Sequence, residues 1–218
     1  MTNRMYTMLK LFYKCCQGEK IQMIRSRHFL HIKTFILALL LFAMAACASS
    51  TSSTSYHDPS MDFSVLRTIA VMPFVNLTRD KQAAERVRDT FANNLLSTGT
   101  LYVIPSGEVA RGISRSGIVN AAEPSSEEIG KLAAIIKADA VITGVVREYG
   151  QVRSGASSAN VISLSMQMIE VQSRKVVWTA SSSKGGISMG DRLLGSGGKP
   201  MNQVTEAAID DIITQLFE

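Results

Sequence analysis

A cysteine at the end of an apolar run is the residue of this sequence with the clearest chemistry. Residues 35–46 (FILALLLFAMAA) are apolar without interruption, Arg25, Arg27 and Lys33 precede them, and two alanines lead directly into Cys47. This run is shorter than the roughly 20 residues that span a bilayer as a helix. A basic flank, a short apolar core and small residues before a cleavage point are typical of a signal peptide. We therefore expect residues 1–46 to be a signal peptide that is removed.

The residues around this cleavage point indicate what happens to the thiol. Residues 44–47 (MAAC) resemble a bacterial lipobox, in which the cysteine is lipidated and becomes the new N-terminus. The resemblance implies that Cys47 carries acyl chains such as palmitate and anchors the protein to a membrane. Ala48 carries no acidic signal of the kind associated with inner-membrane retention, which favours the periplasmic face of the outer membrane.

The charge of the chain divides at the same point. The whole chain has a formal net charge of +5, but residues 1–46 hold seven Lys/Arg and one acidic residue, a net of +6. Residues 47–218 therefore carry a net charge of −1. A mature protein with this charge lacks the excess of positive charge that attracts nucleic acid.

The leader is long when it is counted from Met1. Signal peptides usually have about 15–30 residues, whereas the segment that ends at Ala46 has 46. Counted from Met23, it would have 24 residues with two arginines close to its start. We predict that Met23 is the true start and that residues 1–22 are an extension.

Residues for catalysis or metal binding are scarce. The only histidines are His28, His31 and His57, which fall in the leader and in the polar segment after it. Cys15 and Cys16 also precede the cleavage point. A Ser-His-Asp triad, a His-ligated metal and a multi-cysteine site are therefore not expected in the folded domain. We predict a protein that is not an enzyme and has no cofactor and no metal.

The remaining motifs also favour structural roles. Residues 195–199 (GSGGK) fail the phosphate-loop pattern, because Leu193 stands where its first glycine belongs and Pro200 where Ser or Thr would bind the metal. The acidic pairs 127–128 and 210–211 fit a helix N-terminus and an exposed helix face. A hydrolase that uses carboxylates alone is the alternative, and it would need paired acids that converge in a pocket.

The hydropathy pattern predicts one α/β domain. Residues 47–62 are rich in Ser and Thr and are expected to form a flexible tether, followed by a domain over residues 63–218. We expect a mixed β-sheet of about five strands, flanked by three to four helices. The expected strands are 68–73, 101–104, 140–146, 162–168 and 176–182, and the expected helices are 84–99, 125–136 and 200–217.

Three segments of the domain resemble a known family. Residues 69–78 (IAVMPFVNLT), 137–144 (KADAVITG) and 176–180 (VVWTA) are similar, in this order, to the CsgG-like envelope lipoproteins. That group includes the curli secretion lipoprotein and the lipoprotein activator of a peptidoglycan synthase, and its fold is similar to the TolB N-terminal domain. The resemblance implies no active-site residues.

The curli channel adds long amphipathic hairpins that cross the membrane, and this chain departs from it there. Membrane-crossing strands need about 9–11 residues each. Residues 147–160 are too few and too polar for two such strands, and residues 185–198 lack alternation. We therefore predict that this protein does not itself form a pore.

The leading functional hypothesis is a non-enzymatic outer-membrane lipoprotein that assembles or activates an envelope protein complex. The alternative is a subunit of an oligomeric ring in a curli-like export system. The expected partners are the membrane, through the anchor on Cys47, an unknown envelope protein and, in the alternative, further copies of the chain.

Met189, Leu193 and Leu194 are candidate partner-binding residues, because apolar side chains in a Gly-rich loop are costly to expose; the loop could equally fold back and bury them.

Overall fold

The computed structural model describes residues 53–154, 157–186 and 198–218. Cys47 and the leader lie outside these ranges, as do Met189, Leu193 and Leu194, so the structure leaves their predicted roles untested. Among the described residues, no helix has the length and apolar character needed to cross a bilayer.

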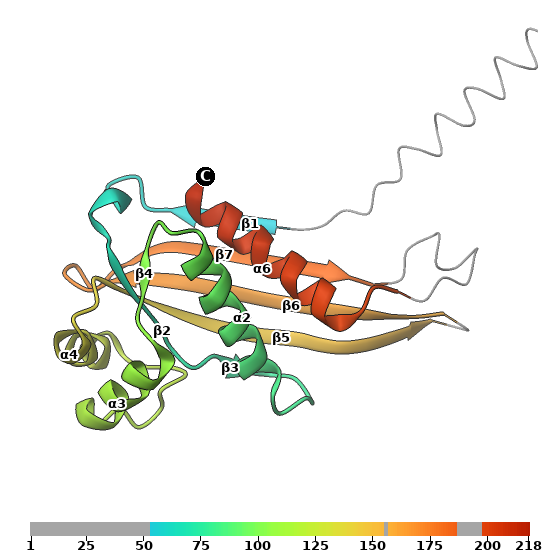
Figure 1. Ribbon diagram of the computed structural model, residues 1–218, viewed down its shortest axis with the longest axis horizontal. Helices are drawn as coiled ribbons and strands as arrows, with labels where there is room; N and C mark the ends of the chain where they lie inside the picture. The colour runs from blue at the N-terminus through green and yellow to red at the C-terminus, as the bar shows by residue number, and fades with distance from the viewer. Residues whose placement is uncertain (1–52, 155–156, 187–197) are drawn as a thin grey trace, which may run out of the picture. The chain divides into compact units, whose positions relative to one another are not determined.

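The centre of the structure is a mixed β-sheet of seven strands (Figure 1). Its strand order is β1-β7-β6-β5-β2-β4, and β3 pairs with β5 beyond the end of β2. Strands β2, β3, β4 and β5 are joined in parallel, whereas β5, β6, β7 and β1 are antiparallel neighbours. The strands are β1 (Ser53–His57), β2 (Thr68–Val71), β3 (Val75–Asn76), β4 (Tyr102–Val103), β5 (Ala140–Ser154), β6 (Ser157–Glu170) and β7 (Val176–Gly185).

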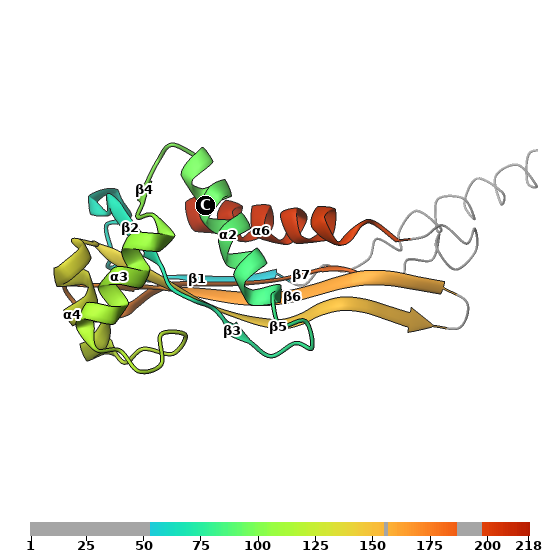
Figure 2. The same ribbon diagram turned by 60° about the horizontal axis from the view of Figure 1, so that its bottom comes forward.

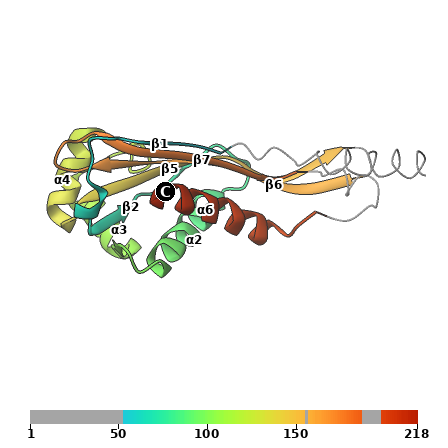
Figure 3. The same cartoon turned by 90° about the horizontal axis from the view of Figure 1, so that it is seen from above.

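Four described helices cover the sheet unequally. The helices are α2 (Ala83–Ser97), α3 (Ser106–Ser116), α4 (Ser126–Ile136) and α6 (Met201–Phe217), and a short 3-10 turn spans Phe63–Val65. Helices α2 and α6 lie along one face and share the larger hydrophobic core with it (Figure 3). Helices α3 and α4 form a smaller core on the other face, against β2 and the end of the sheet where β5 begins. The predicted α/β single domain is thus confirmed, with seven strands in place of about five.

The expected helix start at Ser125 is confirmed in atomic detail. The Ser125 hydroxyl accepts a hydrogen bond from the Glu128 amide, at 3.3 Å, and the Glu128 carboxylate accepts one from the Ser125 amide, at 2.8 Å. This reciprocal pair satisfies two amides that the first turn of a helix leaves free. The hydrogen bonds from the Ser125 amide and hydroxyl hold the pKa of Glu128 below its ordinary value.

Helix α3 is absent from the sequence-based prediction. It begins directly after Pro105 and ends at Gly117, whose φ of 72° is the left-handed conformation typical of a helix end. Few apolar residues mark the helix, because its contact with α4 depends on Gly112, where a Cβ atom would overlap the side chains of Leu132 and Ile136. Hydropathy does not reveal a helix that packs through a glycine.

The predicted tether over residues 47–62 is wrong in its second half. Residues 53–57 form β1, an edge strand that pairs with β7 from Ser53 opposite Ser182 to His57 opposite Trp178. Backbone pairing with an existing edge orders a polar segment that could not fold alone. His57 consequently belongs to the folded domain, where its ring packs edge-on against Phe63 with 5.5 Å between the ring centroids.

The expectation for residues 147–160 is also corrected. Instead of a short polar connection, they continue β5 and β6 as a paired ribbon that reaches Ser154 opposite Ser157. Figure 2 shows this end of the two strands projecting past helix α6. Residues 147, 148 and 151–153 are exposed, whereas Tyr149 packs against the larger core and Ala159 is buried. The side-chain amide of Asn160 also donates a hydrogen bond to the Lys199 carbonyl at 2.8 Å.

Candidate functional site

Trp178, on β7, is fully buried. Its indole Nε1 donates a hydrogen bond to the Gln215 carbonyl of α6 at 3.3 Å. A buried ring with a satisfied N–H contributes packing, and it offers no platform for a ligand.

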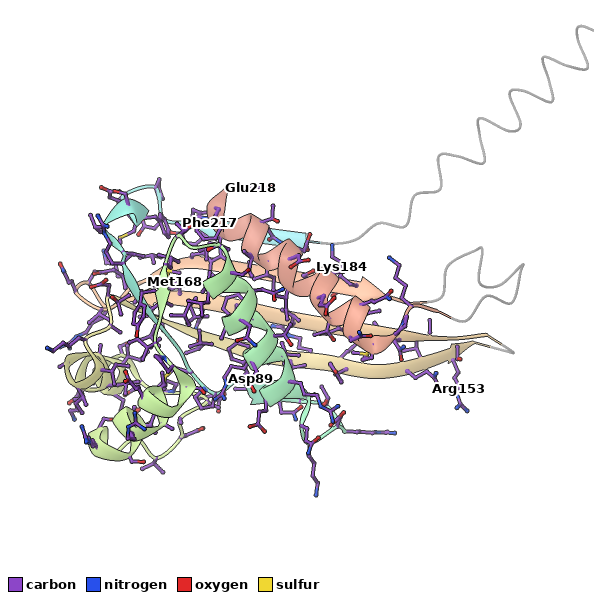
Figure 4. All side chains as sticks on the ribbon, viewed as in Figure 1. Asp89, Arg153, Met168, Lys184, Phe217 and Glu218 are labelled. Carbon is purple, nitrogen blue, oxygen red and sulfur yellow. The ribbon has the colours of Figure 1, made fainter. Side chains whose placement is uncertain are left out.

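The two acidic pairs hold structural contacts. Glu127 forms an ion pair with Lys131 one turn later, at 3.1 Å, and Glu128 closes the helix cap. Asp210 accepts a hydrogen bond from the side-chain amide of Asn94 at 3.0 Å, and Asp211 forms an ion pair with Lys184 at 2.9 Å. Figure 4 shows Lys184 beside α6. Across the described ranges, no group of three or more His, Cys, Asp or Glu residues is placed to hold a metal.

Glu170 is a buried carboxylate at the turn between β6 and β7. Its oxygens accept hydrogen bonds from the Gln172 amide at 2.9 Å and the Ser173 amide at 2.6 Å. Burial alone would raise the pKa of Glu170, but the hydrogen bonds from Ser173 and Gln172 outweigh it and hold the pKa below its ordinary value. The Glu170 carboxylate therefore stabilises the turn by accepting hydrogen bonds from its backbone amides.

We expect Glu170→Gln to destabilise the domain at neutral pH. The native pKa is lowered, so the carboxylate stabilises the fold above its unfolded-state pKa, and this contribution disappears as the pH falls through the native pKa. The expected loss is on the order of 1 kcal/mol at pH 7. Urea unfolding should show the difference from wild type shrinking in acid, while Glu206→Gln, at an exposed site, changes little. A difference that stays constant with pH would contradict this role.

The most distinctive surface of the described domain is a polar face of the sheet, which we call the open face. It lies opposite α2 and α6 and is not covered by α3 and α4, because those helices pack over the other end of the sheet. Cross-strand hydroxyl pairs run over it, with 2.7 Å between the side-chain oxygens of Thr54 and Ser181 and 2.9 Å between those of Ser163 and Ser183. The open face consists of Thr54, Ser163, Ser165, Gln167, Thr179, Ser181 and Ser183; Thr143, on the same side of β5, is buried.

A hollow of about 510 Å³ lies on the open face, beside the loop that precedes α4. Its charged lining residues are Glu123 and Arg147. Arg147 occupies a β-bulge, since Val146 pairs with Leu164 and Glu148 with the preceding residue Ser163. A bulge redirects the side chain at which it occurs, and here Arg147 is exposed at the rim of the hollow.

A second hollow, of about 440 Å³, lies at the C-terminal end of α6 and is mostly apolar. Phe63, Leu66, Leu101 and Phe217 line it, and the buried Met168 forms part of its floor. Figure 4 places Phe217 and Met168 at this end of the structure. No polar group in its lining combines with another as a catalytic pair would, and the hollow is an extension of the core.

Sequence reasoning did not identify the open face as a site, although its signal was present. Ser163, Ser165 and Gln167 alternate with buried residues, and this alternation indicates a strand with one polar side. The pattern does not tell whether a polar side faces solvent alone or meets hydroxyl groups from neighbouring strands. That depends on the register with β7 and β1, and β1 was not predicted.

The fold and these surfaces define a class of protein, namely a small α/β domain built on a mixed sheet. The chain belongs to the GNA1162-like family, whose description reads "Putative lipoprotein GNA1162-like" and whose model matches residues 59–218.

The relatives agree with this assignment. A curated relative in Neisseria meningitidis serogroup B, "Putative lipoprotein NMB1124/NMB1162", is 26% identical over 149 residues, covering 66% of this chain and 69% of that protein. The crystal structure of lipoprotein GNA1162 from N. meningitidis has a TM-score of 0.50 and 22% identity, over 69% of this chain and 98% of that one. A PelC dodecamer from Paraburkholderia phytofirmans gives 0.51 and 18%, over 75% and 97%. These structures support the fold, and the resemblance to CsgG-like proteins stays a prediction.

Proposed function

We propose that this protein is a non-enzymatic lipoprotein of the cell envelope, anchored through Cys47, that assembles or activates a periplasmic protein complex. The observation that carries the proposal is the open face. It consists of hydroxyl and amide side chains on a sheet, and the charged residues that line its hollow are Glu123 and Arg147. Such a surface can recognise a polar partner through hydrogen bonds, and Arg147 at the rim of its hollow is a residue type that protein interfaces favour.

The anchor is the second element of the proposal. Membership of a lipoprotein family and the MAAC sequence at residues 44–47 support lipidation of Cys47. Each buried CH₂ of an acyl chain contributes about 0.8 kcal/mol, and stable attachment requires more than one chain, which bacterial lipidation provides. Because Ala48 follows the cysteine, we place the protein at the periplasmic face of the outer membrane.

The open face can be tested with a double substitution, Arg147→Glu with Gln167→Arg. Both side chains are exposed, so the fold should be retained while the charge and shape of the face change. We expect crosslinking in cells, followed by mild detergent extraction, to recover the envelope partner of the wild type at least about tenfold less from the variant. The matched control is Arg115→Glu on α3, which is also exposed and lies outside the open face. Equal recovery from all three proteins would exclude the open face as the docking surface.

A second candidate function is that of a subunit in an oligomeric ring of an export system. One observation favours it besides the dodecameric state of PelC. β3 pairs with β5 only as far as Val146, so the outer edge of β5 from Arg147 to Ser154 has no strand partner within the described residues. An open strand edge can pair with another chain. In this alternative, self-association is the function.

A further inference from the structure

Basic side chains gather at one end of the described domain, which we call the basic end. It comprises the loop after β3, the extension of β5 and the residues before α6. The loop is placed there by the hydrogen bond that the Leu77 amide donates to the Val146 carbonyl, at 3.0 Å. The exposed basic residues of this end are Arg79, Lys81, Arg153 and Lys199, and Arg147 lies between this end and the hollow of the open face. Its acidic residues are the half-buried Asp80 and the exposed Glu148, and Asp89 and Glu206 lie close by, beside Tyr149.

Exposed basic residues also lie at the opposite end of the sheet, among them Arg67, Lys137 and Lys175, so the position of the anchor decides which end can meet the bilayer. Two exposed apolar side chains lie among the cations, Leu77 with 64% of its surface accessible and Val152 with 39%. Exposed apolar groups surrounded by Lys and Arg are the combination that favours the interface of an anionic bilayer.

The covalent path to the anchor is short. Because β1 begins at Ser53, only six peptide steps separate it from Cys47, and they span at most about 22 Å when fully extended. Strand β1 runs antiparallel to β7, so its first residue points toward the end where β7 finishes and the β5–β6 ribbon projects. The chain from the anchor therefore enters the domain from the side of the basic end.

The ribbon extends well beyond this entry point. Ser53 lies opposite Ser182, which pairs with Leu164, and β6 has seven further residues between there and Ser157. At about 3.3 Å per residue, the ribbon reaches about 23 Å further along the strand direction. This distance is close to the greatest span of the chain between Cys47 and Ser53, so the ribbon can touch the membrane surface in which Cys47 is held. Figure 4 shows Arg153 on this part of β5, directed away from the sheet.

We propose that the basic end lies against the bilayer that holds the anchor, with the β5–β6 ribbon in contact with anionic lipid headgroups. The inference rests on the proposed lipidation of Cys47. It assigns the ribbon to the membrane and leaves the open face accessible from the side. The contact would orient the domain, because one lipid anchor restrains position without fixing rotation.

A pair of site-specific labels tests this contact. Once Cys47 is acylated and the leader removed, the mature chain has no other thiol, so a single introduced cysteine can carry a fluorophore. Gln151→Cys places it on the ribbon, and Ser114→Cys places the control on α3; both positions are exposed. The lipidated protein is reconstituted into vesicles of phosphatidylcholine and phosphatidylglycerol that contain a headgroup-linked quencher. We expect the label at position 151 to be quenched at least about twofold more than the label at position 114.

The outcomes separate the inference from the function on which it rests. Equal quenching at the two positions in vesicle-bound protein overturns the inference and leaves the anchor intact. Protein that does not float with the vesicles refutes the anchor, and the inference with it. Adding Arg79→Glu and Arg153→Glu to the ribbon-labelled protein should remove the difference, and so should vesicles of phosphatidylcholine alone; a difference that survives both contradicts recognition of anionic lipid. Shielding of position 151 in native membranes but not in vesicles indicates a protein partner and also overturns the proposal.

Discussion

Cys47→Ser is expected to release the protein from membranes completely. The hydroxyl of serine cannot replace the thiol to which the lipid is joined, so the variant carries no acyl chain. Loss of the anchor removes about 0.8 kcal/mol for each buried CH₂, so the membrane-bound fraction should fall to background. Fractionation of cells that express the wild type and the variant measures this directly.

Intact mass gives the control for this experiment. The membrane-bound wild type should have the mass of residues 47–218 plus acyl groups, whereas the variant should appear unacylated. Ser49→Ala, two residues after the cysteine, should behave as the wild type. A Cys47→Ser protein that stays with the membrane fraction through washing at high salt would refute the lipid anchor.

Trp178→Ala is expected to be the most destabilising single substitution in the core. The indole is fully buried on β7, where it packs beneath α6 and pairs across the sheet with Met168 and His57. Truncation of a buried tryptophan leaves a cavity and removes the hydrogen bond to the Gln215 carbonyl, at a cost of about 3–5 kcal/mol. Because small domains have about 5–15 kcal/mol of stability in total, the midpoint of urea unfolding should fall sharply.

Two companion variants identify the cause. Trp178→Phe keeps an aromatic ring but cannot donate the hydrogen bond, so it should cost less than the alanine variant. Val176→Ala, on the same strand but 39% exposed, should change the stability by less than about 1 kcal/mol. If the alanine variants at positions 176 and 178 unfolded at the same urea concentration, the assignment of Trp178 to the core would be wrong.

The sequence predicts those parts of the fold whose side chains have a clear period. Helix α6 and strand β6 were found because their apolar residues recur at intervals of 3.6 and two residues, and α4 because its cap has a specific signature. Strand β1 and the ribbon were missed for the opposite reason. Backbone pairing extends them, and few of their side chains are apolar, so hydropathy gives no strand pattern there.

The sequence predicts only part of the candidate site. It places all three histidines outside the folded domain, and the structure corrects this for His57, whose Nε2 lies 3.5 Å from the Leu216 carbonyl oxygen. The open face could not be assembled from the sequence, because it depends on hydroxyl groups meeting across β1, β7 and β6. The basic end could not be predicted from the sequence either, because residues 79–81 and 147–153 are brought to the same end of the sheet by the pairing of β3 with β5.

The native mass of the lipidated protein, extracted from its membranes in mild detergent, distinguishes a tethered assembly factor or activator from a ring subunit. We expect one copy of the chain, or one copy with a co-purifying envelope protein that is lost when Arg147→Glu and Gln167→Arg alter the open face. A discrete ring of many copies with no other protein would contradict the proposed role as an assembly factor or activator, and would establish self-association as the function.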